Sequence, residues 1–496
     1  MLKILSSRQI REWDAYTIIQ EPIASIDLME RASKAFVRWF ADRFNISGRV
    51  GIICGTGNNG GDGLAIARLL KQENYNVSVW IVRGGKESDD FKANSERLGK
   101  MKLSEITSSV DPVLFADCDI LIDALFGSGL SRSAVGIYAQ VIDCLNQAAA
   151  LRIAVDIPSG LMADHSSTGR IVLADHTVSF QLPKLAFLLP ENQAYVGEWH
   201  LVDIGLDNTF IYEQETPYYY LTRESVKKIL KPRFKFSNKG DHGKALLIAG
   251  SYGKMGACIL SAKSVLRSGI GLLTLHVPRQ GYAIVQTSVP EAMVSIDEHD
   301  QFFSTLPSLE VYTAIGIGPG LGQQKESVEA FKKLLQAGKP LVIDADALNM
   351  LSTHRELLHL IAPGSILTPH PKEFERLVGK WGNDFDRLEK QRQLAREIKS
   401  VIIVKGAHTS ITTADGKVYF NSTGNPGMAT GGSGDVLTGI LTSLLAQNYS
   451  SLEAAILGVY IHGMAGDLAA AEKTMYAMMA SDIFECLPAA FKELTR

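Results

Sequence analysis

The sequence predicts an α/β protein with two domains, each built on a parallel β-sheet covered by helices. The chain has 496 residues, too many for a single hydrophobic core. Short apolar runs of strand length alternate with helix-periodic segments in both halves. Polar and glycine-rich stretches follow the apolar runs, as they do where parallel sheets bind ligands. Both halves therefore predict ligand sites at the carboxyl ends of their strands.

Composition argues against several classes of protein. Fifty basic and 53 acidic residues give a net charge of −3 with no sustained run of one sign, so nucleic acid and anionic membranes are not expected partners. No Cys-x-x-Cys pair occurs, which argues for a reducing compartment and against disulfides or a zinc site. The first residues lack a signal-peptide core, and no apolar run approaches the ~18 residues of a membrane span. We expect a cytoplasmic, soluble homo-oligomer.

In the first half, residues 1 to about 215, two helices precede the first strand. Ser6 and Ser7 can cap a helix that runs to about Ile19, and residues 26–44 repeat apolar side chains at helical spacing. Further helices are expected at residues 62–72, 89–100 and 135–150. Strands are expected at residues 49–55, 76–82, 119–126, 152–157, 177–180 and 198–202.

The loop after the first strand raises the possibility of a dinucleotide dehydrogenase. Gly55, Gly57 and Gly60 satisfy the Gly-x-Gly-x-x-Gly pattern between a strand and a helix. That fingerprint requires an acidic residue at the end of the second strand, where this chain has Arg83. The hydride-transfer interpretation is therefore disfavoured.

Oxygen-bearing side chains gather at the same predicted sheet edge. Hard oxygen ligands of low total charge suit an alkali cation or a water-filled polar site better than zinc or iron. Asp123 and Asp156 can alternatively cap the turns that follow them. The set comprises Asn58, Asn59, Asp62, Asp123, Asp156 and Ser159.

Four motifs of the first half resemble the YjeF N-terminal family, the NAD(P)H-hydrate epimerases. They are Gly55-Thr-Gly-Asn-Asn-Gly-Gly-Asp-Gly63, Asp123-Ala-Leu-Phe-Gly-Ser-Gly-Leu130, Asp156-Ile-Pro-Ser-Gly160 and Gln181-Leu-Pro-Lys184. The resemblance implies a Rossmann-like three-layer α/β/α domain that interconverts the R and S epimers of hydrated NADH and NADPH. It implies K⁺ binding by Asn59, Asp123 and Ser159, and Asp156 as the catalytic carboxylate for proton transfer. The substrate site would comprise Asn58, Asn59, Gly60, Gly61, Asp62, Gly127, Ser128, Gly129, Leu130, Ser131, Arg132, Ser133, Tyr138 and Asp156.

Residues of about 212–235 are expected to form a hinge, with a short helix at 223–230, and the second domain covers residues 225–496. The turn from Ser251 to Gly256 is not a Walker A loop, because no Gly-Lys-Ser/Thr closes it. A helix should follow it to Ser268. Strands are expected at residues 244–250, 272–277, 313–317, 341–345, 365–367 and 401–404, followed by a hairpin of residues 409–413 and 417–421.

The glycine-rich loop Asn425-Pro-Gly-Met-Ala-Thr-Gly-Gly-Ser-Gly-Asp435 precedes an apolar helical run. Backbone N–H groups at such a helix N-terminus attract phosphate. Asp435 could instead be a plain N-cap. Other strand ends supply Lys405 and acids for a metal or base, including Asp344, Asp346 and Glu373.

This second half resembles the ribokinase superfamily and, within it, the YjeF C-terminal family of ADP-dependent NAD(P)H-hydrate dehydratases. The motifs are Gly318-Pro-Gly-Leu-Gly322, Asp344-Ala-Asp-Ala-Leu-Asn349, Thr368-Pro-His-Pro-Lys-Glu373 and the glycine loop. The resemblance implies dehydration of the S epimer at the expense of ADP, with Mg²⁺ and with Asp435 as catalytic base. Contacts to the hydrated nucleotide would come from Ala257, Gly320, His370, Pro371, Lys372, Glu373, Phe374, Glu375, Arg376 and Asp435. Contacts to ADP would come from Lys405, Gly406, Ala407, His408, Thr409, Asn425, Pro426, Gly427, Met428, Ala429, Thr430, Gly431, Gly432, Ser433 and Gly434.

Two details qualify these contacts, and two alternatives remain open. His370, between two prolines, fixes the loop or contacts substrate rather than transferring a proton, and Pro426 removes one N–H donor. The fused motif sets favour a bifunctional enzyme that repairs NADHX and NADPHX, the hydrated nucleotides. The alternatives are a vitamin or sugar kinase fused to an accessory domain, and a first domain that only binds nucleotides or a partner.

Overall fold

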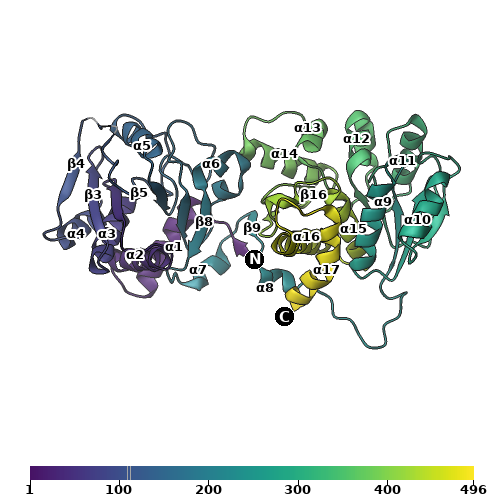
Figure 1. Ribbon diagram of the computed structural model, residues 1–496, viewed down its shortest axis with the longest axis horizontal. Coiled ribbons are helices and arrows are strands. Elements are labelled where there is room, and N and C mark those ends of the chain that lie inside the picture. Colours follow the sequence, from purple (N-terminus) through teal and green to yellow (C-terminus); the bar gives the residue numbers. More distant parts are fainter. Residues whose placement is uncertain (109, 112, 496) are drawn as a thin grey trace. The chain divides into compact units, whose positions relative to one another are not determined.

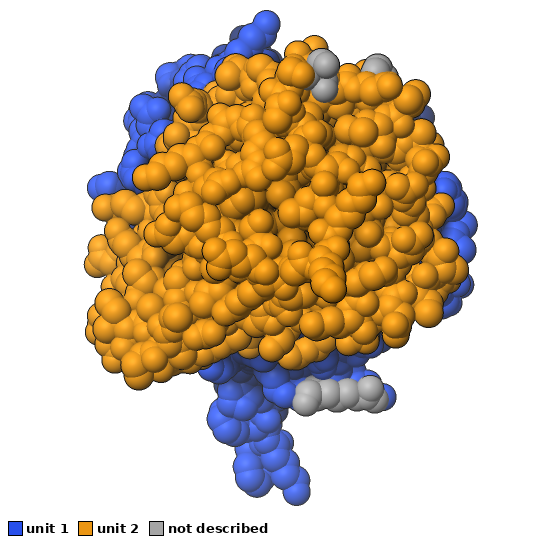
Figure 2. All heavy atoms as spheres, turned by 90° about the vertical axis from the view of Figure 1, so that its left-hand side faces the viewer, with its two compact units in different colours: residues 1–2, 217–382, 386–496 blue, residues 3–216, 383–385 orange. Residues whose placement is uncertain are grey.

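The structure is a computed structural model that describes residues 1–108, 110–111 and 113–495. It divides into two compact units, which Figure 2 colours separately. The N-terminal unit comprises Lys3–Thr216 with Asn383–Phe385. The C-terminal unit comprises Met1–Leu2, Pro217–Gly382 and the chain from Asp386 onward.

The N-terminal unit contains a seven-stranded sheet whose neighbouring strands all pair in parallel. In spatial order the strands are β4 (Leu103–Ile106), β3 (Asn76–Val82), β2 (Arg49–Cys54), β5 (Ile120–Ala124), β6 (Leu151–Val155), β7 (His176–Phe180) and β8 (Glu198–Val202). Its helices are α1 (Ser7–Gln20), α2 (Ser25–Ala41), α3 (Asn58–Gln72), α4 (Asp89–Arg97), α5 (Ile137–Gln147), α6 (Gln193–Val196) and α7 (Asn208–Glu213), with 3₁₀ turns at Leu185–Leu188 and Pro190–Asn192.

Helices cover both faces of this sheet, which gives the expected three layers. Ile52 packs into a core with Phe36 of α2, whereas its neighbour Ile53 packs with Val141 of α5. Successive strand residues point to opposite faces, so an uninterrupted apolar strand requires cover on both sides. Figure 1 accordingly shows α5 on the opposite side of the sheet from α2 and α3.

The C-terminal unit contains an 11-stranded mixed sheet. Its strands are, in spatial order, β1 (Leu2–Lys3), β9 (Tyr218–Tyr220), β18 (Val418–Phe420), β17 (Ser410–Thr412), β16 (Val401–Val404), β15 (Ile366–Leu367), β14 (Leu341–Ile343), β13 (Ala314–Ile317), β10 (Lys244–Ile248), β11 (Leu272–Val277) and β12 (Met293–Ile296). Only β17 runs antiparallel to its neighbours among the pairings described for this sheet. The hairpin expected around Asp415 and Gly416 is therefore present.

The helices of this unit again lie on two faces. They are α8 (Arg223–Lys227), α9 (Met255–Arg267), α10 (Tyr282–Ser288), α11 (Lys325–Gln336), α12 (Ala345–Thr353), α13 (Pro371–Val378), α14 (Asp384–Glu397), α15 (Ser433–Ala446), α16 (Ser451–Lys473) and α17 (Ala480–Thr495). The 3₁₀ turns are Arg279–Gly281, Arg355–Leu360 and Pro426–Met428. Ile403 packs with α15 to α17, and Ile402 packs with α11 to α13.

Three expectations from the sequence were wrong in detail. The tyrosine-rich stretch expected within a hinge forms β9, because Tyr218–Tyr220 pairs with β18 in the C-terminal sheet. Helix α3 begins at Asn58, four residues earlier than expected, so that the polar loop forms its first turn. An apolar helix long enough to cross a membrane does occur: α16 has a window of mean hydropathy 1.4, of which 78% is buried inside the structure. Its apolar surface is explained by this burial.

Candidate active sites

A cavity of about 770 Å³ lies at the carboxyl ends of the strands in the N-terminal unit. The loops after β2, β5 and β6 all reach it, as the parallel sheet predicts. Most residues expected to bind substrate line the cavity: Asn58, Asn59, Asp62, Gly127, Ser128, Gly129, Leu130, Arg132, Ser133, Tyr138 and Asp156.

Gly60, Gly61 and Ser131 do not line this cavity. A Cβ at Gly60 would lie 1.9 Å from the carbonyl oxygen of Gly55, and one at Gly61 would lie 3.0 Å from the sulfur of Met29. These two glycines therefore let α3 approach the end of β2 and the helix α2. They contribute to the site by letting the segments that form the cavity wall pack closely together.

Asp156 has an unusual backbone conformation, and several hydrogen-bond donors hold its carboxylate in place. Asp156 has φ +66°, and its Oδ1 accepts hydrogen bonds from the Lys184 ammonium at 2.6 Å and the Phe180 N–H at 3.2 Å. Strain of this kind persists only where the surrounding structure enforces it, and it concentrates at functional sites. Lys184 is 1% exposed, so this ion pair is desolvated.

The sequence reasoning did not identify Lys184 or Asp14 as site residues, although both line the cavity. Lys184 ends the motif Gln181-Leu-Pro-Lys184, which by itself assigns it no role in the site. Asp14 comes from α1, outside the alternating strands and helices, and nothing in its local sequence distinguishes it. Only the tertiary packing of α1 brings its carboxyl to the cavity.

The carboxyls of Asp14, Asp62 and Asp156 therefore share the cavity with the Lys184 ammonium. Burial raises the pKa of Asp14 to about 7, an effect increased by the charge of Asp156 and opposed by Lys184. Burial also raises the pKa of Asp62 well above its usual range, with further contributions from Asp156 and Asp14. Because like charges at one site disfavour joint ionisation, this group can hold a proton near neutral pH.

The three residues expected to bind K⁺ lie next to this cavity. The Ser159 N–H and hydroxyl donate to the two oxygens of Asp123 at 2.7 and 2.6 Å. Asn59 lies beside Gly127, and its amide nitrogen is buried without a partner. Exchanging the two amide atoms would turn an oxygen toward that position. One carboxylate with hydroxyl and amide oxygens fits a monovalent cation, and burial raises the pKa of Asp123 to about 6.

A second cavity, of about 590 Å³, opens at the start of α15 in the C-terminal unit. Gly432 is the N-cap of this helix with φ +93°, a left-handed conformation that favours glycine. Gly431 and Gly432 line the cavity, so backbone N–H groups of the helix start lie at its wall. This arrangement is suited to an anion.

Asp435 is the third residue of α15, so the alternative that it is the N-cap was wrong. Its side chain lines the cavity and makes no hydrogen bond or ion pair with the residues that the structure describes. Burial raises the pKa of Asp435 to about 7, and Asp344 and Asp346 add to this effect against the opposing charge of Lys405. An unpaired carboxyl with this pKa is suited to accept a proton.

A polar network fixes the charges beside Asp435. The Lys405 ammonium lies 3.0 Å from Oδ1 of Asp344, whose Oδ2 accepts a hydrogen bond from the Thr438 hydroxyl at 2.6 Å. Both carboxylate oxygens of Asp344 therefore have a partner. Glu373, with its pKa raised mainly by burial, and Asp346 line the cavity with Asp435. These three carboxyls are the candidates to hold Mg²⁺.

Only some of the residues expected to contact the hydrated nucleotide line the second cavity. Ala257, Gly320, Glu373 and Asp435 line the second cavity. His370 is the N-cap of α13 and accepts the Lys372 N–H at 3.2 Å, which agrees with the expectation that it fixes the loop. Phe374 is fully buried in the core. Pro371, Lys372, Glu375 and Arg376 lie on α13 outside the lining of this cavity.

The expected ADP-binding residues come from two segments. Lys405–Thr409 lies between β16 and β17, where Gly406 and Ala407 are exposed. Asn425 donates to Asp467 at 2.9 Å and accepts the Gly427 N–H at 3.0 Å, which orders the beginning of the glycine loop. Pro426 is the first residue of a 3₁₀ turn, a position where the missing N–H is tolerated. Met428, Ala429, Thr430, Ser433 and Gly434 complete the loop.

Each half of the chain matches a known protein family. The family model for NAD(P)H-hydrate dehydratase matches residues 245–489, and the model for the YjeF-related protein N-terminus matches residues 25–186. The bifunctional NAD(P)H-hydrate repair enzyme Nnr of Moorella thermoacetica is 37% identical over 99% of this chain and 97% of its own length. This chain belongs to the family of bifunctional NAD(P)H-hydrate repair enzymes.

Another member of this repair family and two solved structures are also similar to this chain. The Escherichia coli K12 enzyme is 35% identical over 93% of this chain and 88% of its own. A ribokinase-like superfamily protein from Enterococcus faecalis is 29% identical with a TM-score of 0.50, over 57% of this chain and 98% of that chain. The Bacillus subtilis ADP/ATP-dependent NAD(P)H-hydrate dehydratase, co-crystallised with ATP and Mg²⁺, is 31% identical with a TM-score of 0.49, over 56% and 98%.

Proposed function

We propose that this enzyme restores hydrated NADH and NADPH in two reactions, epimerisation in the N-terminal unit and ADP-dependent dehydration in the C-terminal unit. The observation that carries the proposal is the presence of two separate cavities with different chemistry. One contains the Asp156–Lys184 pair, and the other contains a glycine-rich helix start beside an unpaired Asp435.

In the C-terminal site, the nucleotide phosphates bind the N–H groups at the start of α15. Asp435 removes the proton from the ring hydroxyl, whose oxygen attacks the terminal phosphorus of ADP and releases AMP. The C–O bond then breaks, phosphate leaves with the bonding electrons, and loss of a proton from the neighbouring ring carbon forms the double bond of NAD(P)H. Phosphorylation is needed because hydroxide is a poor leaving group. The Lys405 charge balances the moving phosphoryl group.

Bound Mg²⁺ would neutralise phosphate charge and orient the transferred group. Asp346 and Glu373 are the residues proposed to hold it, together with the phosphates themselves, since Asp435 serves as the base. The assignment of ADP rather than ATP to this site rests on the family resemblance alone, because a glycine-rich helix start accepts either nucleotide.

In the N-terminal site, Asp156 is proposed to carry the proton transfer at the hydrated ring that accompanies epimerisation. Lys184 and the Phe180 N–H orient its carboxylate, so the reacting oxygen is held before substrate arrives. Asn59, Asp123 and Ser159 are proposed to hold K⁺, which would supply a fixed positive charge at the wall of the cavity.

Absorbance of reduced nicotinamide tests the proposal directly. An R/S mixture of hydrated NADPH is incubated with the purified protein, Mg²⁺, K⁺ and either ADP or ATP. The wild type should restore all NADPH with ADP, whereas Asp156→Asn should stop at the S fraction. A stable phosphorylated product without NADPH would favour a kinase and contradict the proposal.

A further inference from the structure

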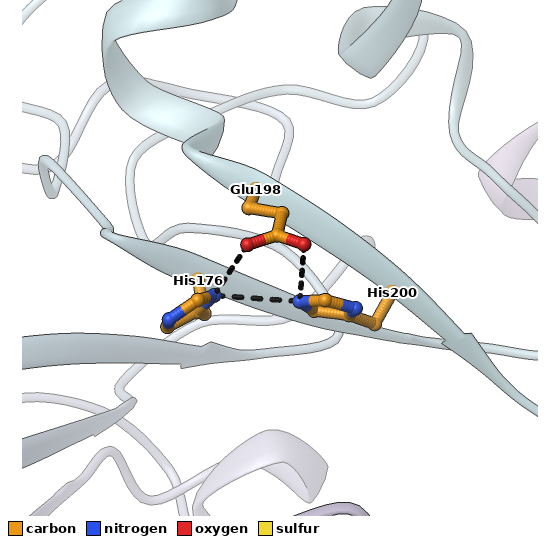
Figure 3. A group of neighbouring side chains, drawn as sticks. All are labelled: His176, Glu198 and His200. Carbon is orange, nitrogen blue, oxygen red and sulfur yellow. Dashed lines mark hydrogen bonds and ion pairs between the residues drawn. The ribbon is translucent and has the colours of Figure 1, made fainter. Parts of the chain in front are cut away.

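Another polar cluster lies outside both cavities, at the end of the N-terminal sheet where strands β7 and β8 begin. His176 is the first residue of β7, and Glu198 and His200 are the first and third residues of β8. In a parallel sheet the amino ends of neighbouring strands share one edge, whereas Asp156 and the other site residues follow the carboxyl ends. Figure 3 shows the three side chains converging across the two strands.

The two histidine nitrogens and the Glu198 carboxylate lie close enough together to share a metal ion. Nδ1 of His176 lies 3.3 Å from Nε2 of His200, Oε2 of Glu198 lies 3.6 Å from the His176 nitrogen, and Oε1 of Glu198 lies 3.7 Å from the His200 nitrogen. Tetrahedral Zn²⁺ has ligand bonds of about 2.0–2.2 Å, which places neighbouring ligand atoms about 3.3–3.6 Å apart. Octahedral neighbours at these bond lengths would be closer, at about 3.0 Å.

The surroundings hold the imidazoles in place and leave one side open. The ring of Trp39 lies 4.9 Å from the His200 ring and 5.8 Å from the His176 ring, measured between centroids. The Glu198 side chain is 69% exposed, so an ion can reach the cluster from solvent. The buried indole N–H of Trp39 has no acceptor, which leaves a donor available near the cluster.

The charge balance is consistent with neutral ligands and one counter-charge. Neutral imidazole is the form that binds metals. Arg43, whose guanidinium lies 4.8 Å from the Trp39 ring centroid, disfavours a nearby cation, and the Glu198 carboxylate offsets that charge.

We propose that His176, Glu198 and His200 form a binding site for a divalent transition metal of the zinc class, with water as the fourth ligand. The metal would join β8, the last strand of the sheet, to β7 and thereby stabilise this edge. The site differs from the cysteine type of zinc site that the cysteine spacing argues against. It is also distinct from the proposed K⁺ and Mg²⁺ positions.

Cobalt binding tests this site in the full chain, purified without a polyhistidine tag and stripped of metal. Co²⁺ should bind at one equivalent per chain with the intense visible bands of four-coordinate cobalt, and Zn²⁺ should displace it. Glu198→Gln keeps the shape of an exposed side chain but removes a ligand, so it should weaken Co²⁺ binding at least about tenfold. His200→Asn should do the same.

Two control variants separate this site from other metal-binding groups. His354→Ala breaks an exposed His–Glu pair, with atoms 3.3 Å apart, that lacks a second histidine. Asp435→Asn alters the C-terminal site. Both should retain the cobalt bands. Zn²⁺ should also raise the melting temperature of the wild type more than that of Glu198→Gln. Six-coordinate spectra, or bands unchanged in Glu198→Gln, would show that the cluster is only a hydrogen-bonded histidine pair.

Discussion

At the scale of single residues, the two units use carboxyl groups whose protonation is set by burial. Asp435 and Asp14 both have a pKa of about 7, and in both cases desolvation is the largest cause. They differ in their neighbours, because Asp435 faces Asp344 and Lys405 whereas Asp14 faces Asp156 and Lys184. Each therefore responds to pH near neutrality for its own local reason.

Asp435→Asn should abolish dehydration while epimerisation continues, because asparagine cannot accept the hydroxyl proton. In the wild type, the rate of dehydration should rise as the pH increases through about 7, since only the ionised carboxylate is a base. Stopped assays of NADPH formation across pH, with epimer ratios from chromatography, measure both. Asp415→Asn, which changes an exposed turn between β17 and β18, is the matched control. Loss of epimerisation in Asp435→Asn would contradict the assignment.

Asp14→Asn should change how stability depends on pH. In the folded state Asp14 keeps its proton up to about pH 7, whereas in the unfolded chain it loses the proton near its ordinary pKa of 3.8. The wild-type free energy of unfolding therefore loses up to about 4 kcal/mol from this group as the pH rises across that window. Asparagine removes this loss.

Urea unfolding at pH 4.5 and pH 8, two values chosen near the ends of that window, measures the difference. Asp14→Asn should gain stability relative to the wild type at the higher pH only. Glu12→Gln, on the exposed side of the same helix, serves as the control and should show no such trend. Equal effects of Asp14→Asn at both pH values would show that Asp14 titrates normally.

At the scale of elements, the start of α15 shows how packing makes an anion site. Gly432 has φ +93°, and an added Cβ would lie 2.5 Å from Cδ1 of Leu260 on α9 and 3.0 Å from Cβ of Ala480. Glycine is therefore needed for both the backbone conformation and the close approach of α9. The same close packing holds the N–H groups at the cavity wall.

Gly432→Ala should weaken ADP binding by about tenfold or more and lower stability by about 1–3 kcal/mol, because strain and a steric clash act together. Calorimetric titration with ADP and thermal unfolding measure the two effects. Gly338→Ala is the matched control: it has φ +66° with no atom within 4 Å of the added Cβ, so it carries strain without the clash. If both variants bind ADP like the wild type, the helix start does not hold the phosphates.

At the scale of the whole molecule, each unit has its own sheet, core and cavity. The epimer made in one cavity must be released or passed on before the other consumes it. The proposed function requires the two sites to cooperate through a shared substrate, and it requires no residue common to both.

An equal mixture of Asp156→Asn and Asp435→Asn should therefore restore all NADPH from an R/S mixture, although neither variant does so alone. Each variant supplies the site that the other lacks, and the S epimer diffuses between chains. The yield of NADPH with ADP and Mg²⁺ is the measurement, and each variant alone is the control. A yield that stays at the S fraction would indicate transfer within one chain only.

The sequence by itself determined the two α/β halves, most of their strands and helices and the loops that reach each cavity, although the short strands β1, β4, β9 and β12 were not expected. These follow from local patterns, because apolar runs specify strands and the carboxyl ends of parallel strands meet at one edge. Motif resemblance added the expected roles of Asp156 and Asp435. The glycine-rich loop predicted the anion-binding helix start, whereas the need for glycine at position 432 follows from its φ of +93° and its contact with Leu260.

The tertiary structure decided what depends on contacts between distant segments. Asp14 reaches the first cavity because α1 packs there, and Tyr218–Tyr220 forms a strand because β18 supplies its pairing partner. His176 and His200 meet because two strands pair in one register. Burial sets the pKa of Asp14 and Asp435, and burial is a property of the packed fold. No local pattern in the sequence encodes these contacts, since each partner lies far along the chain.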